Sequence, residues 1–182
     1  MPATSRRLRL TALPLLLAIL SATVVLTVGS AGASTADLST ASARTTSVIN
    51  TGDSTLQRRE RRIRKAVQVA RNQIGDPYVY GAAGPGAFDC SGLTMYAYAK
   101  AGVRLPRSSD AQAGAVRRVK RSNLHSGDLM FFTSGGSVYH VGIFLKRRGG
   151  RPIILHSSYS GRPVQRDPVW TNNWFAGTLR PR

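Results

Sequence analysis

The strongest constraint on the fold is a change in hydrophobic spacing near residue 128. Upstream of that point, apolar residues recur at helical intervals and predict helices at 54–73, 90–101 and 110–116. Downstream, short apolar runs predict strands at 128–132, 138–145 and 152–156, with further candidates at 163–165 and, as an edge strand, at 174–179. Helices followed by a meander of strands indicate an α+β fold, with N-terminal helices packed on an antiparallel sheet.

Residues 1–33 have the features of a signal peptide. Arg6, Arg7 and Arg9 precede an uncharged apolar run, and Ala31-Gly32-Ala33 matches a signal-peptidase site. An uncleaved membrane anchor is the alternative, because the run approaches the length that spans a bilayer. In either case, the rest of the chain is expected to be exported, secreted or in the cell wall. If the signal is cleaved, no stable membrane insertion is expected.

Residues 34–55 are rich in Ser, Thr and Ala and contain few large apolar side chains. Such a segment buries too little surface to offset its ordering entropy, so we expect a flexible leader. Residues 56–182 are long enough for one domain with a hydrophobic core, and we expect a monomer.

The chain is strongly basic, with 26 Lys and Arg against 8 Asp and Glu and a net charge of +18. Removal of residues 1–33 takes away three arginines and no acid, which leaves +15. Outside the cell, such a chain is attracted to polyanions, and anionic wall polymers are candidate partners. Nucleic acid is not expected, because the charges are dispersed and no recognition motif is present. A surface basic only for solubility is the alternative.

Cys90 is the only cysteine, so it has no intramolecular disulfide partner. It begins the helix predicted at 90–101, where the helix dipole is expected to stabilise a thiolate. A lone cysteine in an exported chain is an intermolecular link, a buried structural residue or a reactive thiol. Its position favours a nucleophile.

A thiol nucleophile needs a base and a group that orients the base. His140 and His156 fall on predicted strands joined by a basic hairpin loop at 146–151, so their imidazoles can be neighbours. His140 could then be the base for Cys90; the alternative is that both histidines are structural. His125 precedes a turn and is expected to be structural. Zinc bound by the cysteine and two histidines is conceivable, but no short-spaced ligand pair supports it, and no metal is expected.

Several segments, in order along the chain, resemble the NlpC/P60 family of cell-wall cysteine peptidases, which have a papain-like core. They are Gly75–Gly81, Phe88–Thr94, Gly102–Arg107 with Gln112 and Gly114, Ser126–Phe132, His140–Leu145 and Leu155–Ser158. The resemblance covers residues 60–182, implies a catalytic domain at 56–182 and implies no cofactor. The chain departs from the family in its longer hairpin at 146–152 and in Tyr80 where tryptophan is expected. No separate wall-binding domain is expected upstream of the catalytic domain.

The resemblance implies a catalytic role for three residues. Cys90 would be the nucleophile, His140 the general base and His156 the residue that orients the base. Tyr78 would position the substrate or support the oxyanion together with the Cys90 backbone N–H.

Three further residues match family positions near the substrate: Asp89, Ser91 and Arg107. Asp89 and Ser91 would contact the free amine of a stem peptide, and Arg107 would lie near the cleft. Equal alternatives are a helix cap for Asp89, a first-turn residue for Ser91 and a structural ion pair for Arg107.

The implied function is hydrolysis of an amide in the peptide stems of peptidoglycan. The expected bond joins D-γ-glutamate to a diamino acid such as diaminopimelate. One alternative is a thiol acyltransferase or toxin-like effector on the same core. Another is a non-catalytic wall-binding module, against which the presence of Cys90, His140 and His156 argues.

Overall fold

The fold is given by a computed structural model that describes residues 38–181. The predicted signal peptide at 1–33 lies outside these residues and stays a prediction. Within the described part of the chain, no helix is both long enough and apolar enough to cross a membrane.

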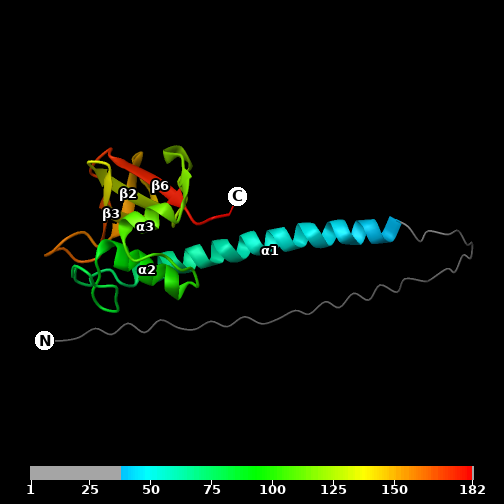
Figure 1. Ribbon diagram of the computed structural model, residues 1–182, viewed down its shortest axis with the longest axis horizontal. Coiled ribbons are helices and arrows are strands. Elements are labelled where there is room, and N and C mark those ends of the chain that lie inside the picture. Colours follow the sequence, from blue (N-terminus) through cyan, green and yellow to red (C-terminus); the bar gives the residue numbers. More distant parts are fainter. Residues whose placement is uncertain (1–37, 182) are drawn as a thin grey trace, which may run out of the picture. The chain divides into compact units, whose positions relative to one another are not determined.

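A six-stranded sheet forms the centre of the fold, with strand order β1-β6-β2-β3-β4-β5. All neighbouring strands are antiparallel. The strands are β1 Arg117–Val119, β2 Leu129–Ser134, β3 Ser137–Arg148, β4 Arg151–His156, β5 Gln165–Pro168 and β6 Trp174–Thr178. The helices are α1 Leu38–Arg71, α2 Cys90–Lys100 and α3 Ser109–Gly114, with a short 3-10 turn at Arg121–Asn123. Figure 1 shows α2 and α3 beside the sheet that contains β2, β3 and β6.

The helices cover one face of the sheet. Side chains alternate along the strands, so Leu129 and Phe131 of β2 face the helices, whereas Met130 and Phe132 face the other way. The helix side holds the larger core, to which α1 and α2 contribute Ile63, Ala66, Val67, Ala70, Leu93, Ala97 and Tyr98. A smaller cluster covers part of the opposite face. The predicted α+β class is confirmed.

The sequence predicted that the terminal strand lies at the edge of the sheet, but the structure places it inside the sheet. β6 pairs with β2 on one side and with the three-residue β1 on the other. Trp174, Ala176 and Thr178 of β6 are buried, which fits an interior strand. The edge prediction was wrong because β1 is too short, and too rich in arginine, to give a strand pattern in the sequence.

The basic hairpin is also more regular than predicted. β3 continues to Arg148 and β4 begins at Arg151, so only Gly149 and Gly150 form the turn, both with positive φ. The β3–β4 register shifts between Phe144 and Lys146. This bulge and the longer strands accommodate the added residues, so the predicted loop at 146–151 is mostly strand.

α1 begins at Leu38, well before the helix start predicted at Ser54. The part of the expected leader at 34–55 that the structure describes is therefore helical in its backbone. No proline interrupts residues 38–71, and alanine, which recurs in this segment, is the best helix former. The C-terminal turns of α1 bury Ile63, Val67 and Ala70 against the core, as the helical spacing predicted.

Candidate active site

Cys90 occupies the first position of α2, and Asp89 caps the helix. The Asp89 backbone is extended, and its Oδ1 accepts a hydrogen bond of 2.7 Å from the Gly92 amide. A Cβ atom on Gly92 would lie 2.1 Å from the Ala82 carbonyl oxygen, so glycine allows this helix end to approach the preceding loop. At the first helical position, the Cys90 backbone N–H has no partner within the helix and is available to a ligand.

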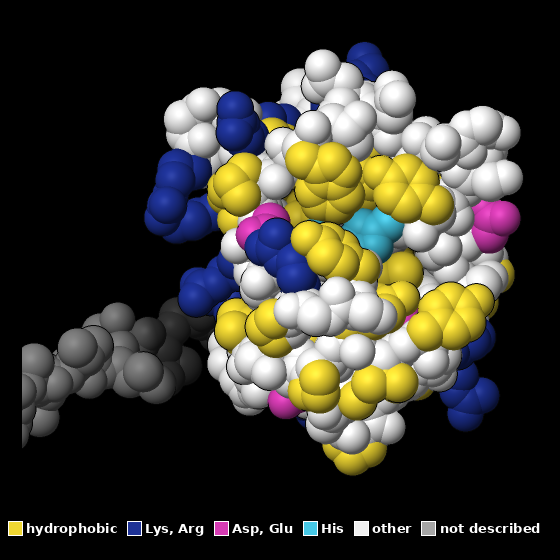
Figure 2. Space-filling model, turned by 90° about the vertical axis from the view of Figure 1, so that its left-hand side faces the viewer, with side chains coloured by type: hydrophobic (Ala, Val, Ile, Leu, Met, Phe, Trp, Pro, Cys, Tyr) yellow, Lys and Arg dark blue, Asp and Glu magenta, His cyan; other side chains and the backbone are white. Residues whose placement is uncertain are grey.

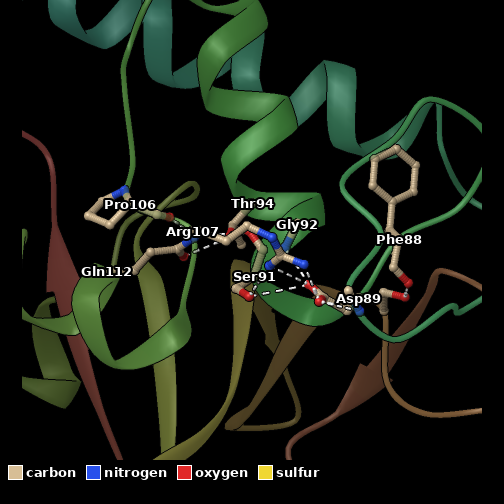
Figure 3. A network of polar contacts seen from close by, with 10 residues as sticks. Phe88, Asp89, Ser91, Gly92, Thr94, Pro106, Arg107 and Gln112 are labelled. Carbon is tan, nitrogen blue, oxygen red and sulfur yellow. Dashed lines mark hydrogen bonds and ion pairs between the residues drawn. The ribbon is translucent and has the colours of Figure 1, made fainter.

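Asp89 is the centre of a polar cluster beside Cys90. Its carboxylate accepts hydrogen bonds from the Gly81 amide at 3.0 Å and from the Ser91 hydroxyl at 3.2 Å. Arg107 reaches across from the loop before α3 to both carboxylate oxygens and donates to Ser91 Oγ at 2.8 Å (Figure 3). Burial raises the pKa of Asp89, but the hydrogen bonds from Arg107 and Gly92 outweigh it, so the net pKa is lowered and the carboxylate is ionised.

The buried Gln112 holds this cluster in place. Its Nε2 donates to the carbonyls of Ser91 and Pro106, each at 2.9 Å, and its Oε1 accepts from the Thr94 hydroxyl at 2.7 Å. One side chain of α3 therefore fixes both α2 and the segment that carries Arg107.

The two predicted site histidines are hydrogen-bonded to one another. His140 Nε2 lies 2.8 Å from His156 Nδ1, and both side chains are buried. Ile143 pairs with Leu155, so Gly142 lies opposite His156 and His140 lies diagonally across the two strands. A Cβ atom on Gly142 would meet the His156 Cβ at 3.2 Å, so the glycine leaves the space through which the imidazoles meet.

The histidine pair continues to Asp167, which the sequence did not single out. His156 Nε2 lies 3.0 Å from Asp167 Oδ2. His156 pairs with Gln165, which places Asp167 diagonally across β4 and β5 on the same face. Gln165 Nε2 also donates to this carboxylate oxygen at 2.5 Å. The predicted fourth strand ended at 165, and an acid so close to a turn gave no signal of its own.

The carboxylate at the end of this chain fixes the tautomer of each imidazole. Burial raises the pKa of Asp167, but the hydrogen bonds from His156 and Gln165 lower it more, so Asp167 is ionised and only accepts. His156 must then carry its proton on Nε2 and accept on Nδ1. His140 in turn donates from Nε2, which leaves its Nδ1 unprotonated. The assignment follows from donor and acceptor chemistry.

Both imidazoles are neutral near neutral pH. Burial, together with the neighbouring His156, lowers the pKa of His140 to about 3. Burial also lowers the pKa of His156, although the hydrogen bond to Asp167 opposes it. The uncharged His140 has a lone pair on Nδ1 with which to accept a proton.

Cys90 lies against the residue that follows His140. The backbone amides of Val141 and Ser91 hydrogen-bond the Cys90 sulfur. These contacts lower the pKa of the thiol, but burial raises it more and Asp89 adds to the rise, so the net pKa is raised. The pKa of Cys90 is therefore shifted in the opposite direction from the thiolate stabilisation that its helix position predicted, because burial and an adjacent carboxylate disfavour the charged form.

Tyr78 lies on the loop beside the thiol, bridged to Phe88 in the backbone. Burial, together with the neighbouring Cys90 and Asp89, raises the pKa of Tyr78, so its hydroxyl is protonated and able to donate. The pocket around the thiol is lined by Tyr78, Tyr80, Gly81, Asp89, Cys90, Ser91, Arg107, Ser108, Ser109 and Tyr139. It thus contains all four of the residues predicted to contact substrate.

A second pocket adjoins the first, and Tyr139 lines both. His140, His156 and Asp167 line it together with the aromatic rings of Tyr159 and Trp170. Trp170 stacks on His156 with the ring centroids 5.5 Å apart. Figure 2 shows histidine in a hollow bordered by hydrophobic side chains. We call these two pockets together the catalytic cleft; Tyr139 is the lining residue that they share.

No group of three His, Cys, Asp or Glu side chains in the described part of the chain is arranged to hold a metal ion. The chemistry available to the cleft is that of a thiol, a neutral imidazole and the hydrogen-bond donors around them.

The sequence pattern of the NlpC/P60 family matches residues 75–182. The chain therefore belongs to the NlpC/P60 family. It is 45% identical over 98 residues to a Corynebacterium glutamicum protein named "Probable endopeptidase", a match that covers 54% of this chain and 44% of that protein. A Mycobacterium tuberculosis protein of the same name is 45% identical over 103 residues, or 57% of this chain and 25% of that protein. The chain thus spans less than half the length of these relatives.

Solved structures share the fold. The P60 domain of an antigen from Mycobacterium avium subspecies paratuberculosis superimposes with a TM-score of 0.59 at 30% identity, covering 68% of this chain and 98% of that one. The peptidoglycan hydrolase RipB of Mycobacterium tuberculosis gives a TM-score of 0.58 at 29% identity, covering 68% of this chain and 67% of that one.

Proposed function

We propose that this protein is a cysteine peptidase that hydrolyses an amide in peptidoglycan stem peptides, with the D-γ-glutamyl–diaminopimelate bond as its target. The observation that carries the proposal is the placement of Cys90 at a helix start against the strand of His140, whose imidazole ends a hydrogen-bonded chain through His156 to Asp167. Relatives named as endopeptidases and a solved peptidoglycan hydrolase support the reaction and substrate class.

Acylation begins with the neutral pair. His140 Nδ1 takes the thiol proton as the Cys90 sulfur attacks the carbonyl carbon, and the carbonyl electron pair moves onto oxygen. The Cys90 backbone N–H and the Tyr78 hydroxyl are the donors for that oxyanion. Because the pKa of Cys90 is raised and that of His140 lowered, proton transfer accompanies attack and does not precede it.

The second half of the reaction releases the product. The carbon–nitrogen bond breaks as His140 returns its proton to the leaving amine, which leaves a thioester on Cys90. Water then gives a proton to the same Nδ1 and attacks the thioester carbon, and the carbon–sulfur bond breaks. The departing sulfur recovers the proton, and the free carboxyl product leaves.

In this scheme His156 and Asp167 do not touch the substrate. They keep the proton of His140 on Nε2, where it is donated to His156, so that Nδ1 stays unprotonated and free to accept the thiol proton. They also stabilise the imidazolium that forms during attack, since the carboxylate lies at the end of the chain. Both are positioning residues.

The polar cluster of Asp89, Ser91 and Arg107 serves the acyl side of the cleft in this proposal. The ionised Asp89 offers a negative charge to a stem-peptide ammonium, and Arg107 holds that carboxylate in place. The cap and ion-pair roles that the sequence left open are compatible with substrate contact, because the same carboxylate lines the pocket.

We also propose that the protein acts outside the cytoplasmic membrane, as the signal-peptide features of residues 1–33 predict, and that it works on the wall as a monomer. Its positive charge would favour retention among anionic wall polymers. Retention that does not weaken with rising salt would contradict this part of the proposal.

The decisive test is mass spectrometry of purified muropeptides after digestion. Wild-type protein should release peptides with a new free amine on the diamino acid, and Cys90→Ala and His140→Ala should release none. His125→Ala is the matched control, because His125 is exposed and lies outside both pockets; it should cleave like the wild type. Cleavage by Cys90→Ala would refute the proposal.

The same experiment distinguishes the peptidase from the acyltransferase alternative, because both would form the same thioester on Cys90 but give different products. With an added amine acceptor, a transferase would yield acyl-amine adducts in place of the hydrolysed acid. Binding of wall without any new product, in wild type and variants alike, would indicate the non-catalytic module.

A further inference from the structure

A second concave surface adjoins the active site and is lined by three arginines with no acidic side chain among them. We call this the arginine groove: Arg121, Arg147 and Arg151 with Trp170 and Trp174, completed by Gly150, Pro152, Val169, Thr171 and Asn172, in a hollow of about 530 Å³. Trp170 also lines the pocket that contains His140 and His156. The arginine groove and the catalytic cleft therefore share a wall.

Backbone carbonyls, not carboxylates, hold two of the guanidinium groups. Arg147 donates to the Arg121 carbonyl at 2.5 Å and to the Gly150 carbonyl at 2.8 Å. Arg121 donates to the Asn172 carbonyl at 2.7 Å and to that of Trp174, and its guanidinium lies 4.2 Å from the centre of the Trp174 ring. These contacts orient the cations without neutralising them.

The ion pairs of the described residues lie elsewhere on the molecule. They involve Arg64, Arg107, His156, Arg162 and Arg180, and none includes an arginine of the groove. Like charges gathered in one hollow repel each other, and a bound anion relieves that repulsion. Guanidinium forks suit oxyanions, and several cations together favour a multiply charged ligand over a single carboxylate.

The groove also explains the longer hairpin. Arg147 is the penultimate residue of β3 and Arg151 begins β4, so both belong to the residues by which this chain departs from the family pattern. The extension does not enter the pocket around the thiol. It lines the arginine groove together with the segment that carries Trp170, which is hydrogen-bonded to it through the Val169 amide and the Pro152 carbonyl at 3.0 Å.

We propose that the arginine groove binds the phosphate groups of an anionic cell-wall polymer and thereby holds the wall beside the histidine side of the cleft. The two indole rings would pack against the polyol or sugar portions between phosphates. The location of this binding in the cell wall rests on the proposed function, whereas the affinity of the groove for the polymer does not.

Binding is tested without turnover by using the full chain with Cys90→Ala and a soluble poly(glycerol phosphate), measured by calorimetry over a range of salt concentrations. In that background, Arg147→Gln with Arg151→Gln should weaken binding about tenfold or more and flatten its salt dependence. Lys65→Gln with Arg104→Gln removes the same charge at exposed positions outside the groove and should change the affinity less than about twofold.

Equal weakening by the two double variants would overturn the proposal, because net charge alone would then explain binding. So would failure of the Cys90→Ala protein to bind the polymer, or equal binding of an uncharged polyol of similar length. Competition by free inorganic phosphate would show that the phosphate group itself is recognised.

A parallel assay keeps this proposal separate from the catalytic one. Arg147→Gln with Arg151→Gln, in an otherwise wild-type chain, should cleave small soluble muropeptides at the wild-type rate but release products from intact wall more slowly. Groove-dependent polymer binding by a protein that cleaves no muropeptide would refute the peptidase and leave the groove standing.

Discussion

His140 Nε2 lies 2.8 Å from His156 Nδ1, and the two rings meet edge to face with their centroids 5.0 Å apart. This contact turns two buried histidines into one directional unit, because Asp167 at the far end can only accept a hydrogen bond. The hydrogen bonds are therefore donated towards the carboxylate, from His140 to His156 and from His156 to Asp167. This leaves a lone pair on His140 Nδ1, the nitrogen that takes the thiol proton in the proposed mechanism.

The first prediction concerns Asp167→Asn. The amide NH₂ can donate to His156 Nε2, which would reverse both tautomers and put a proton on His140 Nδ1. We expect kcat to fall on the order of 10²-fold with a small change in KM. The pH profile of kcat/KM should shift, and ¹⁵N NMR should report the changed tautomer of His140.

The control for this prediction is Arg162→Gln, which removes an exposed contact of 3.4 Å to the same carboxylate and one of 3.5 Å to the Tyr159 hydroxyl but leaves the carboxylate in place. It should retain nearly full activity. If Asp167→Asn kept wild-type kcat and tautomers, Asp167 would have no part in setting the base.

The second prediction concerns Gly142→Ala. The added methyl group would press on the His156 Cβ and on Ile154 Cδ1, each 3.2 Å away, and separate the two imidazoles. Overpacking of this kind costs about 1–3 kcal/mol of stability. Activity should fall more than stability, as measured by muropeptide turnover beside urea unfolding. Gly114→Ala is the control, since a Cβ there meets nothing within 4 Å; an unchanged turnover number in Gly142→Ala would contradict the spacing argument.

The spacing of apolar residues predicted most of the fold, because the side chains that face the core recur at the helical or strand period along the sequence. The nucleophile and both histidines could be singled out because each residue type is scarce in this chain. Asp167 could not, since its role depends on the β4–β5 register, which no local pattern encodes. The raised pKa of Cys90 was also beyond reach, because burial is a property of the packed core and not of the helix start.

The third prediction is loss of stability in mild acid. The folded state holds His140 with a pKa of about 3, below the ordinary 6.5 of an exposed histidine, so the unfolded chain binds the proton more readily. The stability contributed by the neutral imidazole is present above about pH 6.5 and is lost as the pH falls towards the folded value.

Urea unfolding at several pH values measures this effect. Between about pH 7 and pH 5, wild type should lose roughly 1–2 kcal/mol more than His140→Gln, which lacks the titrating group. An identical pH dependence in the two proteins would mean that His140 is not buried in its neutral form. The exposed His125 should make no difference when replaced by glutamine.

The fourth prediction concerns Ser157→Ala. Ser157 is fully buried directly after His156, and its hydroxyl donates to the Phe88 carbonyl at 2.7 Å, two residues before Cys90. This bond ties the strand end that carries one positioning residue to the loop that presents the nucleophile. The Phe88 carbonyl keeps its hydrogen bond from the Val79 amide, so the loop should stay folded after the substitution. We expect a loss of about 1–2 kcal/mol in unfolding free energy, as for other single buried hydrogen bonds.

Turnover of the Ser157→Ala protein should fall, with KM for muropeptide nearly unchanged, because the thiol and the imidazole lose their fixed relation. Ser122→Ala, at an exposed position in the 3-10 turn after β1, should alter neither quantity. A Ser157→Ala protein that was destabilised but fully active at low temperature would reduce Ser157 to a purely structural residue.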